Sequence, residues 1–262
     1  MRYVATAAHV LIGMHDAGIP APFLRFNRTD GGAQWVKTAY EEWAYESASD
    51  TAILRFEPPE MLETVSLGAS IALNEDRITD NAVGPGDDLF MPGLFLMFND
   101  PSRIYGTDKN VPIIRSGHIA SMPGEPVKTK VGMLDAYLVE ARSIGGLSGS
   151  PVFVHLGAMR IKDGKVENAQ VPGPGISSGI FYLLGFVHGH FPVIGDAEVD
   201  SSDVAGISRQ DVNMGIAIVV PIQHVLELID RPDVRKPREQ ELADWWASHG
   251  GVNEASSADA LS

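Results

Sequence analysis

The apolar residues of this chain come in short runs rich in β-branched and aromatic side chains, with glycine, proline, asparagine or aspartate between the runs. Runs of this kind are typical of strands joined by turns, and they leave little room for long helices. The 262 residues include 27 Gly and 17 Pro, more than an average chain of this length holds, which agrees with many turns. We therefore predict an all-β fold.

The expected strands fall into two groups separated by a turn-rich connection. Four precede the connection, at residues 2–6, 22–27, 34–38 and 51–56, and six follow it, at 88–98, 113–121, 134–140, 151–155, 180–188 and 214–219. Six strands are enough to close one small antiparallel barrel. The second group therefore predicts a closed barrel, whereas the four strands of the first group are too few to close one.

Three further elements are expected beside these strands. An Asp-Gly pair at 163–164 between alternating residues predicts a hairpin within 159–170. Pro221 stands at a plausible first helical position, and Val225, Leu228 and Ile229 follow at helical spacing, so a helix is expected there. A second, short helix is expected at 239–246, with the adjacent tryptophans 245 and 246 packing it on the domain. The small, polar residues 253–262 predict a disordered tail.

Charge and cysteine content exclude several classes of function. The formal net charge is −14, from 20 Lys and Arg against 34 Asp and Glu, and a field of that sign opposes binding to nucleic acid or to an anionic membrane. Cys is absent, which excludes disulfides, thiolate metal sites and a cysteine nucleophile. No stretch reads as about 20 apolar helical residues, and the first residues lack a secretory signal pattern. We expect a cytoplasmic protein without nucleic-acid or membrane partners.

Three short motifs carry residues suited to nucleophilic catalysis. His9 ends the run Thr-Ala-Ala-His, Asp50 directly precedes an apolar strand, and Ser148 lies in the glycine-rich run Gly-Gly-Leu-Ser-Gly-Ser-Pro. A serine hydroxyl is a poor nucleophile unless a base takes its proton, and an imidazole can do so near neutral pH. A carboxylate on the other ring N–H fixes the tautomer of the imidazole. We predict that Ser148 is the nucleophile, His9 the base and Asp50 its orienting partner.

The glycines before Ser148 have a separate expected task. Without a Cβ, Gly146 lets its backbone N–H and that of Ser148 turn toward one point, where they would stabilise a developing oxyanion. Other residues compete for each role: Asp16 and Asp30 for the carboxylate, and Ser143 and Ser150 for the nucleophile. Neither acidic competitor precedes an apolar strand, and the Gly-x-Ser-Gly frame selects Ser148. His9 could also be a core histidine, and Asp50 a turn-capping residue.

In these three motifs and their order the chain resembles the trypsin-like (chymotrypsin-fold) serine peptidases, closest to the bacterial members without cysteine. The resemblance extends over residues 4–229, through the segments 84–87, 117–121, 184–187 and 215–218. It implies two antiparallel β-barrels with a cleft between them, a serine endopeptidase acting on proteins or peptides, and no metal or organic cofactor. The implied division is a partial first barrel at 1–57, a connection at 58–86, a second barrel with its terminal helix at 87–230, and a tail at 231–262.

The chain departs from that family at two places. Family members have a further pair of strands before the histidine, so the first barrel looks truncated, and we expect the natural protein to start upstream of Met1. Unpaired strand edges would then hold His9 loosely. Leu147 stands where members activated by precursor cleavage carry Asp, and it cannot pair with a freed N-terminus. Activation by N-terminal trimming is therefore not expected.

Specificity is placed by the resemblance on the segment before the nucleophile and on the strand after the hairpin. The corresponding residues are Arg142, Val187, His188 and Gly189. Related glutamyl endopeptidases use a histidine of this strand, which raises a preference for acidic side chains as a hypothesis. That histidine stands two residues after a glycine of the strand, whereas His188 stands three after Gly185. In a regular strand the side chain of His188 would therefore project from the opposite face. His188 and His190 could also be a metal pair, but two imidazoles are too few for a tight site, and we predict no metal.

Two other functions remain open at this point. The same cleft could belong to a catalytically impaired relative that binds protein segments without turnover. An esterase using Ser148 on another fold is a weaker alternative, because the residues after Ser148 lead into a strand rather than into a helix. The oligomeric state is not predicted.

Overall fold

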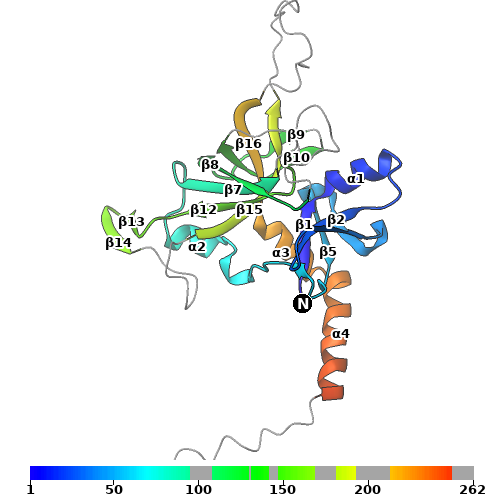
Figure 1. Cartoon of the computed structure of the whole chain (residues 1–262). Helices are drawn as coiled ribbons and strands as arrows, with labels where there is room; N and C mark the ends of the chain where they lie inside the picture. Colours follow the sequence, from blue (N-terminus) through cyan, green and yellow to red (C-terminus); the bar gives the residue numbers. More distant parts are fainter. Residues whose placement is uncertain (95–107, 130, 142–146, 169–180, 193–212, 250–262) are drawn as a thin grey trace, which may run out of the picture.

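A closed six-stranded antiparallel barrel forms the centre of the molecule, as predicted (Figure 1). The computed structural model describes residues 1–94, 108–129, 131–141, 147–168, 181–192 and 213–249. In barrel order the strands are β11 (Tyr137–Glu140), β16 (Asn213–Pro221), β15 (Phe181–Pro192), β12 (Pro151–His155), β7 (Asp88–Leu94) and β8 (Pro112–Ser121). Each of the six expected strands of the second group contributes one of them.

The barrel interior is filled by aliphatic side chains that alternate along the strands. Val152 and Val154 of β12 face inward two residues apart, and both are fully buried. The same core includes Met91, Ile119, Val139, Leu184, Val187 and Val219. Burying a side chain of this size stabilises the fold by roughly 1.5–3 kcal/mol, so the barrel is a rigid support for the loops that leave it.

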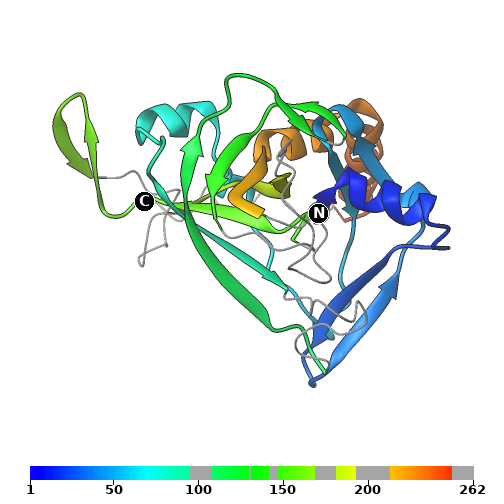
Figure 2. The ribbon, with the colours of Figure 1, turned by 90° about the horizontal axis from the view of Figure 1, so that it is seen from above.

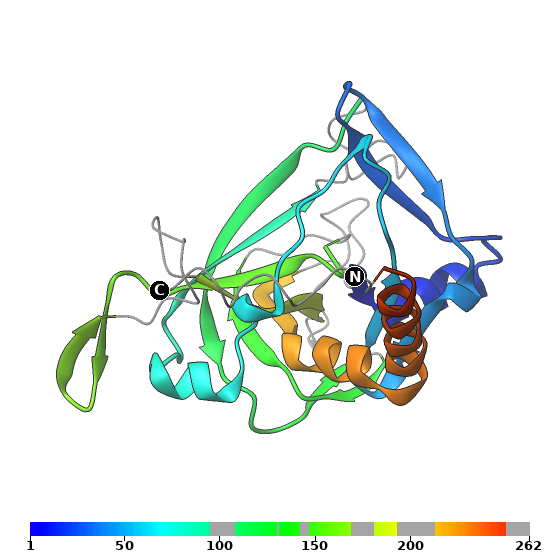
Figure 3. The same cartoon turned by 90° about the horizontal axis from the view of Figure 1, so that it is seen from below.

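The N-terminal part forms two separate three-stranded sheets. One has the order β1-β5-β4, from Tyr3–Ala7, Thr51–Arg55 and Trp43–Glu46, and the other the order β3-β2-β6, from Ala33–Lys37, Phe23–Arg28 and Leu62–Glu63. Figures 2 and 3 show the β2–β3 hairpin leaning out from the barrel. Within the described residues these two sheets do not join into a second closed barrel. The fold is therefore mostly β, with one closed barrel and a helical C-terminal part.

Several short elements were not predicted from the sequence. They are α1 (Ala8–Asp16), α2 (Glu75–Asp80), the strands β4, β6, β9 (Val127–Thr129) and β10 (Gly132–Leu134), and the 3-10 turns Tyr40–Glu42, Ser47–Ser49 and Ala69–Ile71. The strand expected at 134–140 is divided, because β10 ends at Leu134 and pairs with β9, whereas β11 begins at Tyr137 and pairs with β8 and β16. The last four residues of the strand expected at 88–98 lie outside the described residues.

The predicted hairpin is present as β13 (Met159–Lys162) and β14 (Lys165–Asn168). Asp163 and Gly164 both have positive φ, as a two-residue turn between strands requires. Arg160 anchors the hairpin, since its guanidinium contacts the Asp87 carboxylate and donates to the backbone carbonyls of residues 81 and 82. The hairpin extends away from the barrel in all three views of the ribbon.

Two helices follow the barrel. The first is α3 (Ile222–Asp230), which packs Ile222, Val225 and Leu228 into a core shared with β1 and β15. The second is α4 (Pro232–His249), longer than the expected 239–246 because it continues through Pro237. Its tryptophans, 245 and 246, are 49% and 63% exposed, so the expectation that they pack on the domain is wrong. The expected disordered tail lies outside the described residues.

Helix α4 projects from the body of the molecule in Figure 1. Its side chains are mostly exposed, and Arg55 of β5 donates to Glu241 across the junction. In the part of the chain that the structure describes, no helix combines the length and the apolar character that crossing a membrane requires.

Candidate active site

His9 is the second residue of α1, which follows β1 without a break. A helix leaves its first backbone N–H groups unpaired unless a capping residue accepts them, and Ala7 at this helix start has no side-chain acceptor. Asp50 supplies the cap from 41 residues away. Its backbone carbonyl accepts from Ala8 N at 2.9 Å, and its Oδ1 accepts from His9 N at 2.8 Å. The carboxylate is thus part of the local structure that holds His9.

Asp50 is brought to this helix start by the pairing of β1 with β5, in which Ala7 lies opposite Thr51. It ends the 3-10 turn Ser47–Ser49 with φ 50° and ψ 36°, a left-handed conformation that aspartate tolerates better than most residues. The residue is only 1% exposed. Burial alone would raise the pKa of the carboxyl group, but hydrogen bonds from His188 and His9 outweigh burial and lower this pKa to about 2. Asp50 is therefore a buried, charged carboxylate.

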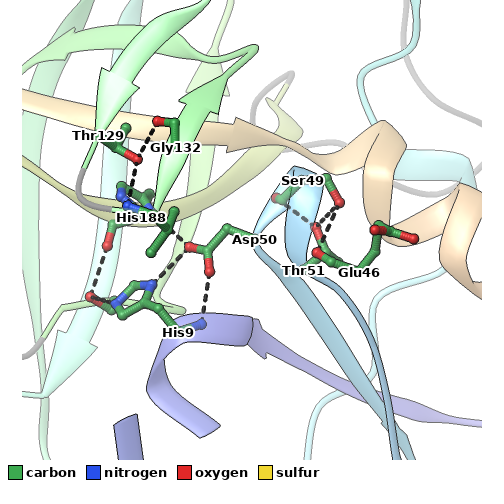
Figure 4. Close-up of polar contacts among 10 residues, drawn as sticks. His9, Glu46, Ser49, Asp50, Thr51, Thr129, Gly132 and His188 are labelled. Atoms are coloured by element: carbon green, nitrogen blue, oxygen red, sulfur yellow. Dashed lines mark hydrogen bonds and ion pairs between the residues drawn. The ribbon is translucent and has the colours of Figure 1, made fainter. Parts of the chain in front are cut away.

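The three residues predicted to act together lie in one hydrogen-bonded chain, of which Figure 4 labels His9 and Asp50. His9 Nδ1 is 2.8 Å from Asp50 Oδ2, and His9 Nε2 is 3.2 Å from Ser148 Oγ. Because the carboxylate accepts at Nδ1, the proton of a neutral imidazole belongs on Nδ1, which leaves Nε2 free to accept from the serine hydroxyl. Residues separated by 139 positions in the chain thus meet in the geometry that proton transfer requires.

Ser148 is presented by a tight turn in which Ser150 N donates to Leu147 O at 2.9 Å. The turn is fixed to β15, because Gly149 N donates to Val187 O at 2.8 Å and Val187 N donates to Ser150 O at 2.9 Å. Gly149 has φ +85°, and a Cβ there would lie 2.4 Å from Thr6 Oγ1. The close approach allowed by this glycine sets the Ser148 turn directly against β1, the strand that leads into α1 and His9.

A fourth side chain, His188, joins the site. Its Nδ1 is 2.5 Å from Asp50 Oδ2, the same oxygen that His9 contacts (Figure 4). Its backbone carbonyl is 2.9 Å from Ser148 Oγ. The register of β15 against β16 shifts between Val187 and Gly189, so the strand has an irregularity at His188. Val187 faces the barrel core and His188, the next residue, contacts Asp50, so the two side chains still lie on opposite faces of β15.

The remaining residues predicted to bind substrate or an oxyanion are not all placed by the structure at the site. The side chain of Val187 is completely buried in the barrel core, which differs from the expected place in a substrate pocket. Gly189 follows the bulge in β15. Arg142 and Gly146 lie outside the described residues, so the pocket entrance and the oxyanion hole stay predictions. Leu147 is buried in the barrel core.

The two competing acids contact other residues, and the competing serine that the structure describes shares the turn of Ser148. Asp16 is largely exposed near His15, and Asp30 pairs with Arg28 on the surface. Ser150 lies in this turn, two residues after Ser148, and the other competitor, Ser143, lies outside the described residues. Of the candidates that the structure describes, Asp50 and Ser148 are the ones brought to His9.

His9, Asp50 and His188 also form the one group of three potential metal ligands in the described part of the chain. Zinc bonds to nitrogen and oxygen of about 2.0–2.1 Å place tetrahedral ligands roughly 3.3 Å apart. Both imidazole nitrogens lie closer to Asp50 Oδ2 than that, at 2.8 and 2.5 Å. These separations fit N–H···O hydrogen bonds better than a shared cation, and the second histidine of the considered pair, His190, is not in this group.

The low pKa of Asp50 predicts an acid-dependent contribution to stability. The carboxyl group titrates at about 2 in the folded protein and near 3.8 when unperturbed, so its contribution is complete above pH 4 and is lost as the pH falls to 2. A shift of this size corresponds to about 2–3 kcal/mol. We expect the free energy of unfolding of the Asp50→Asn variant to be lower than that of the wild type by about this amount at pH 7. Urea unfolding should show this difference becoming smaller between pH 4 and pH 2. A difference that stays constant over this range would contradict the prediction.

No protein-family model and no curated protein sequence matches the chain. Among solved structures, the chain is similar to the MamO protease domain from Magnetospirillum magneticum in its apo form, with 15% identity, a TM-score of 0.47, and coverage of 86% of this chain and 81% of that one. It is also similar to Deg5, with 15% identity, a TM-score of 0.43, and coverage of 86% and 75%.

Proposed function

We propose that this protein is a serine endopeptidase that hydrolyses peptide bonds through His9, Asp50 and Ser148 and an acyl-enzyme intermediate. The observation that supports this most strongly is the continuous chain of contacts from Asp50 Oδ2 through both nitrogens of His9 to Ser148 Oγ. The three residues come from different segments, which are held together by the pairing of β1 with β5, the cap of Asp50 on α1 and the bonds of the Ser148 turn to β15. Proteins or peptides are the substrates, and the chemistry requires no cofactor.

In the proposed reaction, Ser148 Oγ attacks the peptide carbonyl carbon while its proton passes to His9 Nε2. The tetrahedral intermediate collapses when His9 gives this proton to the leaving amine, and an ester on Ser148 remains. A water molecule then loses a proton to His9 and attacks the ester, after which the acid leaves and Ser148 recovers its proton. Asp50 stabilises the imidazolium that forms in each half, and the backbone N–H groups of Gly146 and Ser148 are the proposed oxyanion donors.

The proposed framework is a pair of β-barrels of the chymotrypsin type in which the first is open. The two N-terminal three-stranded sheets correspond to its parts, and the closed barrel corresponds to the second. The open arrangement of the described N-terminal strands also favours one alternative function, a domain that binds protein segments between its two halves without hydrolysing them. The two functions differ in whether Ser148 is reactive.

Labelling with a serine-directed fluorophosphonate tests this difference. We expect the wild-type protein to be labelled and both Ser148→Ala and His9→Ala to lose the label, because the probe reacts only with an activated hydroxyl. Ser150→Ala is the matched control, since Ser150 lies in the same turn and is not part of the proposed chain of proton transfer. It should label like the wild type.

The outcome can be read directly from the set of four proteins. Absence of label on folded wild-type protein would reject the peptidase and favour the binding domain. Label that survives in Ser148→Ala would place the reactive group elsewhere. Circular dichroism of each variant establishes that the comparison is made between folded proteins.

A further inference from the structure

We propose that His188 is a positioning residue of this site: its imidazole holds the Asp50 carboxylate in the orientation in which that carboxylate accepts the His9 Nδ1–H. This inference rests on the proposed function, and it makes catalysis depend on a second histidine. Neither the three catalytic motifs nor the alternation of the strand assigns this role. It follows from the contacts of the folded protein.

The first argument is the hydrogen bonding of Asp50. A carboxylate rotates easily about its last torsion, which has a broad energy profile, so one partner alone does not fix it. Here Oδ1 accepts from the backbone N–H of His9 and Oδ2 faces the Nδ1 atoms of both His9 and His188. Donors around both oxygens leave the carboxylate a single orientation. The His188 contact, at 2.5 Å, is the shorter of the two imidazole contacts.

The second argument is burial. The whole residue is 8% exposed for His188 and 1% for Asp50, and bonds to a charged acceptor are strong where water is excluded. Leaving this carboxylate without one of its donors would cost the desolvation of a charged group. His188 therefore stabilises the ionised form of Asp50, in agreement with the low pKa of that carboxyl group.

The third argument is that the backbone of His188 contacts the other end of the site. Its carbonyl lies 2.9 Å from Ser148 Oγ, and its ring meets the ring of His9 edge-on at a centroid distance of 5.0 Å. A serine hydroxyl has one proton, so it donates either to this carbonyl or to His9 Nε2. His188 thus lies against both ends of the site, with its backbone carbonyl beside Ser148 and its ring on Asp50.

Two substitutions separate the hydrogen bond from the bulk of the side chain. In His188→Asn the amide nitrogen stands the same number of bonds from the backbone as Nδ1 and can still donate to Asp50. His188→Leu keeps a similar volume and has no donor. His155→Asn, at the exposed end of β12, is the control for loss of a histidine elsewhere on the barrel.

Proton NMR provides a test that does not require hydrolysis. An imidazole N–H bonded to a buried carboxylate gives a separate downfield resonance. Nitrogen-labelled histidine should show two such resonances in the wild type and in His155→Asn, and one in each His188 variant. Only one resonance in the wild type would overturn the proposal, whether or not the protein proves to be a peptidase.

Kinetics provide the second test. His188→Leu is expected to lower kcat by about 10- to 100-fold with little change in KM, which corresponds to the loss of one hydrogen bond to a charged group. His188→Asn should stay within about threefold of the wild type, because it restores the donor. A merely structural role would reduce both variants in step with their thermal stability, and equal losses in kcat would overturn the proposal.

Discussion

Alanine at His9 is expected to lower the turnover of a peptide substrate by about 10⁶-fold, and alanine at Ser148 by a similar factor. The base and the nucleophile act as one unit, because a hydroxyl that cannot lose its proton does not attack, and an imidazole without a hydroxyl has no proton to accept. The 3.2 Å contact between His9 Nε2 and Ser148 Oγ is the structural reason for this dependence.

The same reasoning predicts strong non-additivity. The double variant His9→Ala/Ser148→Ala should be no slower than either single variant, and the residual rate should come from binding and from the oxyanion donors. Steady-state rates of all three proteins on one peptide measure this directly. If the losses of the two single variants multiply in the double variant, the two residues do not belong to one proton-transfer unit.

Alanine at Gly185 is expected to prevent folding or to destabilise the protein by more than about 4 kcal/mol. Gly185 lies within β15, between β12 and β16, and a Cβ there would stand 1.8 Å from the backbone carbonyl oxygen of Val220 and 3.3 Å from Ile222 N. Those atoms are main-chain atoms at the junction of β16 and α3, so they cannot move aside as a flexible side chain would.

Gly189→Ala is the matched control on the same strand, since a Cβ at that position would meet nothing within 4 Å. Urea unfolding of the two variants should therefore differ by several kcal/mol, with Gly189→Ala within about 1 kcal/mol of the wild type. Similar stability of the two variants would show that the approach of β15 to β16 is looser than described.

The barrel strands and the three catalytic candidates could be predicted from the sequence because their signals are local. Val152 and Val154 lie in a short apolar run rich in β-branched residues, Asp163-Gly164 has the dihedral preference of its turn, and glycines on either side of Ser148 mark the nucleophile loop. The resemblance to a known family then supplied the pairing of His9 with Asp50 and Ser148, which local patterns cannot give.

The parts that were missed depend on partners distant in the chain. Helix α1 has no capping residue of its own, and its cap is Asp50, 41 residues later. The contact of His188 with Asp50 joins residues 138 positions apart, so no local pattern reveals it. Helix α4 passes through Pro237, a residue that a sequence pattern treats as a boundary, and the prolines at 232 and 237 both fall in its first two turns.

The double duty of Asp50 has a consequence for how such a protein could change over time. A chain that gave up hydrolysis could replace the hydroxyl of Ser148 and keep its architecture, since that hydroxyl closes no helix and pairs no strand. The carboxylate is different, because it completes the start of α1 as well as supporting the imidazole. Relatives that have lost activity should therefore keep Asp50 after Ser148 has been replaced.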